Sequence, residues 1–366
     1  MASWCLEATN SDYQDDYGNL SSHFFSRSGE SFDSKYQIAL DLSHRQSPLP
    51  SPQGAKIYSH ILYPEHSLGR QHVRLALLLS TVSRLLYTMN ASKSNNPNVK
   101  LLACLVEPQD AIDPDDSHYR FLVDGNYVKY VTTSPGTLAG EEIDWTFGPI
   151  LLSKLLPPFP PGNWNKGHVA KDPETGEAAF IETETESLAG VENLWHSVKL
   201  NELDFTHEYL KQRVHKSTHP ELNDGKPVLI KLAVWPWEIA FLETETTVYE
   251  CIRDRGIGPR FLGHLTEGKD GRVVGFVAEW VQGARAAGPG DLEGCRKALG
   301  RLHELGIKLG DTNKYNFLVR EGHDVVLVDF ETAKKCSPQE LEDEMNALQA
   351  YLEDPSSRGG VKVFCE

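Results

Sequence analysis

The pattern of hydrophobic and polar positions divides the first half of the chain into a leader and a globular stretch. Residues 1–54 are rich in Ser, Asp, Gln and Pro, which indicates a disordered leader. Residues 55–156 have the composition of a globular domain of unassigned role. Apolar residues at helical spacing predict a buried helix over 72–89, and a strand is expected at 100–106. Alternation around an Asp-Gly pair predicts a hairpin over 119–131.

A proline-rich run and an acidic stretch separate this domain from the rest of the chain. The run covers 157–162 and ends in glycine, and glutamates are frequent over 174–186. Proline restricts the backbone, and acidic runs favour solvent. We therefore expect a linker over 157–190 and a second domain over 191–366.

The second domain has a more regular pattern of strands and helices. Asp291 is a residue type favoured at helix N-termini, and Gly256 and Gly306 are placed to end helices. One strand is apolar except for a single lysine, Lys231. The predicted strands are 228–233, 261–265, 273–281, 317–319 and 325–328, and the predicted helices are 237–255, 291–305 and 338–352.

Composition and charge narrow the expected partners and compartment. The 366-residue chain has a net charge of −16, which argues against binding to nucleic acid or to anionic membranes, because both need basic surface. The apolar runs are far shorter than the roughly 18 residues of a membrane span, and no signal-peptide pattern is visible. Six scattered cysteines indicate reduced thiols. We expect a cytoplasmic or nuclear protein that is not secreted.

Three polar residues near the C-terminus supply groups that phosphoryl transfer requires. Asp311 and Asn316 lie five residues apart, and Asp329 follows Asn316 by thirteen, at the end of an apolar strand. This chemistry needs a cation on the phosphates, oxygen ligands for Mg²⁺ and a carboxylate near the acceptor hydroxyl. Each residue alone is explained as an ordinary turn residue.

Taken together, these residues resemble a known pattern. The segments 305–319 and 325–331 resemble the catalytic loop and metal-binding motif of the protein-kinase-like superfamily, with Gly-Asp in place of Arg-Asp. The stretch 228–335 is similar to a group of fungal kinase-like proteins, some of which carry an alpha-galactosidase A label. The shared motifs are Glu243-Thr-Glu245, Gly256-Ile-Gly-Pro259 and Gly310-Asp311. No paired carboxylates in a barrel-strand pattern support a glycosidase.

The resemblance implies a fold and a set of roles. The fold is α+β: a bilobal protein-kinase-like fold, with an N-lobe at about 199–281 and a truncated C-lobe at about 282–366, beside a separate N-terminal α/β region. The cofactors are ATP and Mg²⁺. Asp311 orients or deprotonates the acceptor hydroxyl, and Asn316 and Asp329 bind the metal.

Lys231 is the candidate cation for the ATP phosphates. A lysine inside an apolar strand is costly unless it has an anionic partner, and the alternative is an exposed position on an edge strand. Its expected partner is a glutamate of the following helix. Glu245 shares a face with that helix's apolar positions and has the interval to Gly256 that the resembling families show. Glu250 fits the interval of ordinary protein kinases and stays second; Glu243 also competes.

The strand at 273–278 precedes the place where the resemblance implies an adenine-binding hinge. Backbone groups of Glu279, Trp280 and Val281 are the candidates for contacting the base. Trp280 is equally compatible with a place in the hydrophobic core or with a position covering the base.

Three features depart from the family pattern. No Gly-x-Gly-x-x-Gly loop precedes Lys231, and the region 203–217 contains no glycine, so either another device covers the phosphates or they are held weakly. Glu331 replaces the glycine that follows Asp329-Phe330, and either joins the metal site or faces solvent. Only 37 residues follow Asp329, which leaves no room for a peptide-binding helical lobe.

Two functions follow from these observations. The first is an ATP- and Mg²⁺-dependent phosphotransferase acting on a hydroxyl of a small molecule or a protein Ser/Thr. The alternative is a catalytically inactive pseudokinase or nucleotide-binding interaction module, which the missing glycine loop and the short C-terminus favour. The identity of the acceptor stays open.

Overall fold

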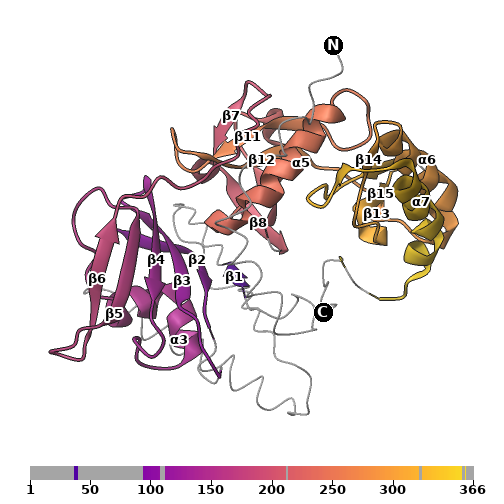
Figure 1. The fold of residues 1–366 in the computed structure, drawn as a ribbon. Helices are drawn as coiled ribbons and strands as arrows, with labels where there is room; N and C mark the ends of the chain where they lie inside the picture. Colours follow the sequence, from indigo (N-terminus) through magenta and orange to yellow (C-terminus); the bar gives the residue numbers. More distant parts are fainter. Residues whose placement is uncertain are drawn as a thin grey trace, which may run out of the picture. The chain divides into compact units, whose positions relative to one another are not determined.

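The described part of the chain forms two compact units. The computed structural model describes residues 37–39, 94–107, 112–211, 213–320, 324–356 and 359 (Figure 1). One unit lies within 32–187 and the other contains 188–366. The expected helix over 72–89, and the expected leader apart from its three residues at 37–39, lie outside the described residues. Several sheets and few helices make the fold α+β.

The first unit is built on a six-stranded sheet with the order β1-β2-β3-β4-β5-β6. Neighbouring strands are antiparallel except β4 and β5, which run parallel. Tyr119, Phe121 and Val169 lie in its core together with Leu151 and Leu156 from the short helical turns. The elements are β1 (Gln37–Ala39), β2 (Val99–Leu105), β3 (Ser117–Val123), β4 (Tyr127–Thr133), α3 (Glu142–Thr146), α4 (Gly148–Ile150), the π-helical turn η1 (Leu151–Leu155), β5 (Lys166–Lys171) and β6 (Ala178–Glu184).

The strand and hairpin expected here are confirmed. β2 covers the strand predicted at 100–106, and β3 and β4 form the predicted hairpin. Asp124 and Gly125 both have positive φ, of 53° and 70°. This is the backbone of the turn that matches the twist of paired strands, and Asp-Gly is a sequence suited to it.

The linker expected over 157–190 is a wrong prediction, since β5 and β6 lie within it (Figure 1). The proline-rich run is held to the sheet by an aromatic cluster in which Phe159 meets Phe121 and Phe180 edge-on at 5.1 and 5.2 Å. The acidic side chains that suggested a solvated linker lie on β6, an edge strand whose Glu182 and Glu184 are exposed. A polar edge strand and a polar linker therefore have the same composition.

The second unit begins with another six-stranded sheet, ordered β7-β11-β12-β10-β9-β8. Only β7 and β11 pair in parallel. The predicted helix over 237–255 is observed as a 3-10 turn followed by α5, which packs on β12. The elements are β7 (Lys199–Asn201), η2 (Glu202–Asp204), β8 (Thr206–Lys211), β9 (Val214–Thr218), η3 (Asn223–Gly225), β10 (Val228–Leu232), η4 (Pro236–Glu238), α5 (Ile239–Cys251), β11 (Phe261–Thr266) and β12 (Val273–Glu279).

The rest of this unit consists of two helices and two small sheets. β13, β15 and β16 form one sheet, and β14 pairs with β17. The predicted strands and helices of this part are all confirmed, although Asp291 binds Arg285 and the backbone of Gly288 and does not cap α6 with its side chain. The elements are β13 (Arg285–Ala286), η5 (Pro289–Asp291), α6 (Leu292–His303), β14 (Ile307–Lys308), η6 (Lys314–Asn316), β15 (Phe317–Val319), β16 (Val325–Leu327), β17 (Lys334–Lys335) and α7 (Pro338–Glu353).

One hydrophobic core runs through the second unit. Tyr249 of α5 links the large sheet to the segment after β16. Its ring centre lies 5.0 Å from that of Phe276, on β12, and 5.4 Å from that of Phe330, which follows β16. Leu299 of α6 and Leu348 of α7 belong to the same cluster. The sheet and the two C-terminal helices are therefore parts of one packed body.

Within the described residues, no helix has both the length and the apolar character needed to cross a membrane.

We expect Leu348→Ala to destabilise the second unit by about 2–5 kcal/mol, because Leu348 is fully buried against the shared core. The free energy of unfolding from urea titration measures this. Asn346→Ala, which changes an exposed residue of the same helix, is the control and should stay within about 0.5 kcal/mol of the parent. Equal losses in both variants would contradict the assignment of this face of α7 to the core.

Candidate functional site

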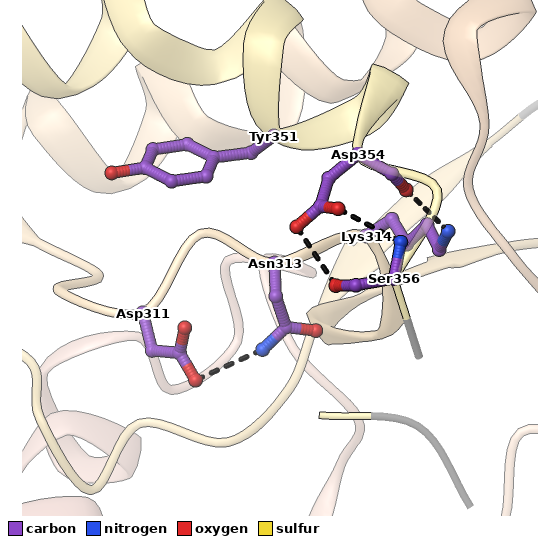
Figure 2. Close-up of a pocket in the computed structure, with 6 residues that line it drawn as sticks. All are labelled: Asp311, Asn313, Lys314, Tyr351, Asp354 and Ser356. Atoms are coloured by element: carbon purple, nitrogen blue, oxygen red, sulfur yellow. Dashed lines mark hydrogen bonds between the residues drawn. The ribbon is translucent and has the colours of Figure 1, made fainter. Parts of the chain in front are cut away.

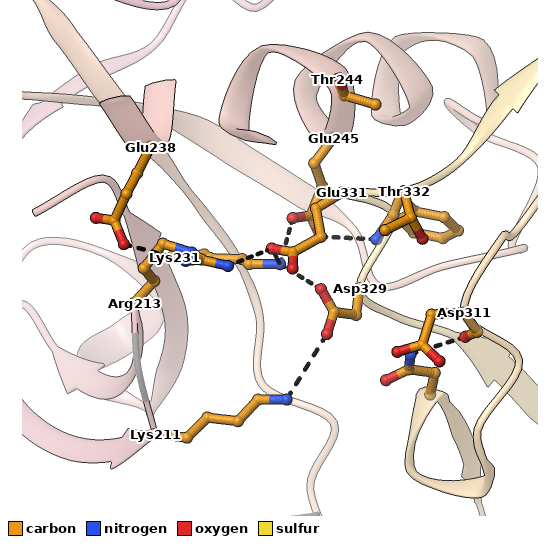
Figure 3. A network of polar contacts seen from close by, with 12 residues as sticks. Lys211, Arg213, Lys231, Glu238, Thr244, Glu245, Asp311, Asp329, Glu331 and Thr332 are labelled. Atoms are coloured by element: carbon orange, nitrogen blue, oxygen red, sulfur yellow. Dashed lines mark hydrogen bonds and ion pairs between the residues drawn. The ribbon is translucent and has the colours of Figure 1, made fainter. Parts of the chain in front are cut away.

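The side chain of Lys231 is buried among three carboxylates. Its ammonium lies 2.6 Å from an oxygen of Glu245, 2.5 Å from one of Asp329 and 3.1 Å from one of Glu331 (Figure 3). Lys231 is 4% exposed. A charge buried this deeply costs several kcal/mol unless it is paired, and here it is paired three times.

The sheet and α5 place the first ion pair. β10 is bonded on both sides, with Lys231 opposite Val214 on β9 and Phe276 on β12, so the lysine lies on an interior strand and not on an edge. Glu245 is on the buried face of α5, three residues after Leu242 and four before Tyr249, which is the spacing of one helix face.

The competing glutamates of α5 have other partners. Glu243 accepts hydrogen bonds from the backbone of Glu192 and Asn193, and Glu250 accepts one from the Asn193 side chain at 2.9 Å. Glu245 is therefore the glutamate that the structure brings to Lys231.

Asp329 has an unusual backbone. It follows β16 with φ of 66°, a left-handed conformation that is uncommon for residues other than glycine. The next amide, of Phe330, donates to Glu245 at 3.2 Å, and the Phe330 ring is buried. Such conformations persist where the surroundings enforce them and are concentrated at functional sites.

Burial and charge oppose each other in this cluster. For Glu245, burial outweighs the attraction of Lys231 and raises the pKa to about 7. For Lys231, burial favours the neutral form, but the carboxylates of Glu245, Asp329 and Glu331 together raise its pKa. Asp329 also loses hydration, yet Lys231 and Lys211 hold its pKa below the usual range. Lys231 and Asp329 are therefore charged, and Glu245 is the group that takes up a proton near neutral pH.

The loop that carries Asp311 and Asn316 lies beside Asp329. The Asn316 side-chain nitrogen donates to the backbone oxygen of Asp311 at 2.9 Å, and Asn316 is buried. The amide of Val328 donates to the backbone oxygen of Asn316 at 3.0 Å. These contacts bring Asn316 next to the residue that precedes Asp329. The Asp311 carboxylate accepts from the Asn313 side chain at 2.9 Å.

Gly310 is required by its surroundings. It has φ of 86°, and a Cβ at this position would lie 2.6 Å from the backbone oxygen of Thr332. Thr332 in turn donates through its hydroxyl to Leu309 at 3.1 Å. The Gly-Asp pair thus permits the loop to approach the segment that follows Asp329.

Sequence reasoning missed a support for this loop. Glu344 of α7 accepts hydrogen bonds from the amides of Leu309 and Gly310 at 3.0 and 2.7 Å, and it lies 2.7 Å from His303 of α6. The backbone bonds and His303 outweigh burial and hold the pKa of Glu344 below its usual range. In the sequence, Glu344 is only a helix residue next to the apolar Met345. Its contacts are to residues more than thirty positions away, and no local pattern predicts them.

A small polar pocket opens beside Asp311 (Figure 2). Its floor is the loop of Asp311 and Asn313, and its other wall is the end of α7 with Tyr351 and Asp354. Lys314 donates to the backbone oxygen of Asp354 at 2.7 Å, which ties the loop to this end of α7. A molecule held here would meet hydroxyl, amide and carboxylate groups and one exposed aromatic ring.

The candidate hinge residues follow β12. Glu279 is its last residue, and its amide donates to Arg260 at 2.8 Å, so that amide is already bonded. Trp280 and Val281 come directly after the strand and are half-buried. The Lys216 ammonium lies 5.5 Å from the centre of the Trp280 ring.

Oxygen atoms of a kind suited to a hard divalent cation gather around Asp329. Oxygen atoms of Glu245, Asp329 and Glu331 lie within 4.8 Å of one another. Glu245 is 2% exposed and committed to Lys231, whereas the Asp329 side chain is 21% exposed. Asn316 uses its side-chain nitrogen, and not its side-chain oxygen, in the bond to Asp311. Carboxylate and amide oxygens are suitable ligands for Mg²⁺.

No protein-family model and no curated protein matches this chain.

The raised pKa of Glu245 predicts a pH-dependent stability. A carboxyl whose pKa is higher in the folded state contributes stability below its unfolded value, and this contribution is lost as the pH rises through about 7. Glu245→Gln mimics the protonated form. Relative to the parent, the variant should therefore gain up to about 3 kcal/mol between pH 5 and pH 8, measured by urea titration at both values.

The control for this experiment is Glu250→Gln, which removes the same charge from the same helix where the side chain binds Asn193. Parallel pH profiles of the parent and Glu245→Gln would contradict the assignment.

We expect Glu344→Gln to lose about 1–3 kcal/mol of stability, because an amide cannot accept all the bonds that the carboxylate receives from Leu309, Gly310 and His303. Hydrogen exchange at the Leu309 and Gly310 amides should become faster. The exposed Glu342→Gln is the control. Unchanged exchange at both amides would show that Glu344 does not support the loop.

Proposed function

We propose that the second unit is an ATP- and Mg²⁺-dependent kinase-like phosphotransferase that acts on a hydroxyl acceptor. The observation that carries the proposal is the buried Lys231–Glu245–Asp329 cluster, joined through Val328 to the Asp311–Asn316 loop. The large sheet with α5 then corresponds to a smaller lobe of a bilobal kinase-like fold, and α6, α7 and the small sheets correspond to a reduced larger lobe.

The chain supplies a group for each requirement of the reaction. Lys231 is the cation that contacts the nucleotide phosphates, and Glu245 orients it. Asp329 and Asn316 hold Mg²⁺, which neutralises charge on the transferred phosphoryl group when it is bound. Backbone groups over 279–281, apart from the amide of Glu279, bind adenine. These roles make use of the charged state of Lys231 and Asp329 at neutral pH.

Asp311 is the proposed acceptor-side group. Its carboxylate accepts a hydrogen bond from Asn313, so its position is restricted while it borders the polar pocket (Figure 2). A carboxylate held in this way orients the acceptor hydroxyl and takes its proton as the phosphoryl group is transferred. The polar lining favours a hydroxyl compound that is itself polar.

A second candidate function is a pseudokinase or nucleotide-binding module without turnover. The observation that favours it is the turn between β8 and β9, which holds Arg213 where the resemblance implies glycines. Both functions predict nucleotide binding, and only turnover separates them.

We also place the protein in a reducing compartment, the cytosol or the nucleus. Among the described residues, Cys104, Cys251, Cys295 and Cys336 form no disulfide bond, and two of them are buried. Cysteines outside disulfides are usual where glutathione keeps thiols reduced.

A thermal-shift titration with ATP, with and without Mg²⁺, tests the proposal. Ligand at 100 times its dissociation constant adds about 2.7 kcal/mol of stability, a shift of about 5–11 °C for a unit of this size. Asp329→Asn should abolish the Mg²⁺-dependent shift, because it removes the charged metal ligand. Asp311→Asn should keep the shift and lose phosphoryl transfer from ATP to polar hydroxyl compounds.

Asp324→Asn is the matched control, an exposed aspartate of the β15–β16 hairpin. A shift that survives Asp329→Asn would refute the metal site. A parent that binds Mg²⁺ and ATP and transfers phosphate to neither an acceptor nor water would favour the pseudokinase.

A further inference from the structure

Two cations lie at the tip of the β8–β9 hairpin and point to the Lys231 cluster. Lys211 ends β8, and it pairs in register with Val214 at the start of β9. The Lys211 ammonium is 3.7 Å from an oxygen of Asp329 (Figure 3). Arg213 lies in the turn, and its guanidinium is 2.8 Å from Glu331.

Arg213 is held in a strained conformation by its partners. Its φ is 63°, and its side chain also binds Glu238 at 3.0 Å and lies over the Phe241 ring at 5.1 Å. Glu238 is itself fixed, because it accepts bonds from the backbone of Val234 and Trp235. An arginine at positive φ is uncommon, and the two ion pairs overcome the cost.

Both cations have donors to spare. The Nε of Arg213 is buried without a hydrogen-bond partner among the residues that the structure describes. Lys211 bonds the backbone oxygen of Gly359 at 3.3 Å, and its separation from Asp329 is longer than a hydrogen bond. An ammonium has three donors and a guanidinium has five in a planar fork. A buried donor left unbonded costs free energy, which an anionic ligand would recover.

The charge of the cluster depends on whether a divalent cation is bound. Lys211, Arg213 and Lys231 face four carboxylates, those of Glu238, Glu245, Asp329 and Glu331. If Asp329 turns to a divalent cation, Lys211 and Lys231 lose a shared anionic partner. The divalent cation changes the net charge of these ionised groups from −1 to +1, which favours an anion, and a phosphate chain bound to the same cation replaces the lost partner.

We propose that Lys211 and Arg213 are a polyphosphate-binding pair. These side-chain cations on the hairpin bind the phosphates that backbone amides bind in glycine-rich phosphate-binding loops. The inference rests on the proposed function, because it assigns the phosphates of the same nucleotide site. Arg213 donates its unpartnered Nε–H to a phosphate oxygen while its terminal nitrogens stay paired with Glu238 and Glu331. Lys211 binds as a point charge next to the metal ligand Asp329.

This pair has a consequence for ligand preference. Affinity depends on the number of phosphates more than on the base, so tripolyphosphate and ATP bind, ADP binds less tightly, and adenosine binds without any contribution from the hairpin. Because the contact is between charges and one of them is partly exposed, affinity falls as salt is added.

The experiment is a calorimetric titration of the parent, Lys211→Ala and Arg213→Lys with inorganic tripolyphosphate, ATP and adenosine, all with Mg²⁺. Lys211 is partly exposed, so Lys211→Ala is expected to fold, and Arg213→Lys keeps the charge that Glu238 and Glu331 require. The control is Lys226→Ala, which changes an exposed lysine just before the first residue of β10, whereas Lys231 lies near the last. Thermal melting without ligand verifies that each variant is folded.

We expect both variants to bind tripolyphosphate and ATP about 10- to 100-fold more weakly, with adenosine unchanged. If the variants bind ATP as the parent does while Asp329→Asn does not bind it, the pair is refuted and the proposed function stands. If tripolyphosphate binding depends on Lys211 and Arg213 but ATP does not bind, the pair stands and the nucleotide function is refuted. If the parent binds neither ligand, both are refuted.

Discussion

The ion cluster around Lys231 is the interaction on which the second unit depends. An ammonium buried inside a sheet is tolerated only because carboxylates reach it from α5 and from the segment after β16. The carboxylates come from α5 and from the segment after β16, and the lysine comes from β10, so the cluster specifies how the sheet, α5 and the C-terminal part pack. A hydrophobic core of the same size would be less selective, since apolar contacts have no direction.

The backbone around the cluster follows from this constraint. Asp329 adopts a left-handed conformation, and the amide of Phe330 is bonded to Glu245, which places the Phe330 ring against Tyr249 in the core. The same segment is bonded to the Asp311–Asn316 loop, and Glu344 of α7 supports that loop from the other side. The polar site and the apolar core thus stabilise each other, and a change in one is felt in the other.

Several parts of this picture could be predicted from the sequence because their signals are local. The β3–β4 hairpin followed from alternation around Asp124-Gly125, and β10 followed from an apolar run with a lysine inside. The intervals among Asp311, Asn316 and Asp329 marked a candidate site before any contact was known. The failure at β5 and β6 has a physical reason: an exposed edge strand and a solvated linker select the same polar residues.

The sequence by itself determined the order of the elements and the identity of the polar groups, since both depend on residue type and spacing along the chain. Only the tertiary structure decided that Lys231 meets Glu245 and not Glu243 or Glu250, and that Glu331 faces the cluster through Arg213 and Lys231. The contacts of Lys211, Arg213 and Glu344 were also decided there. These are contacts between residues tens of positions apart, and their energies depend on burial and charge in three dimensions, which no local pattern encodes.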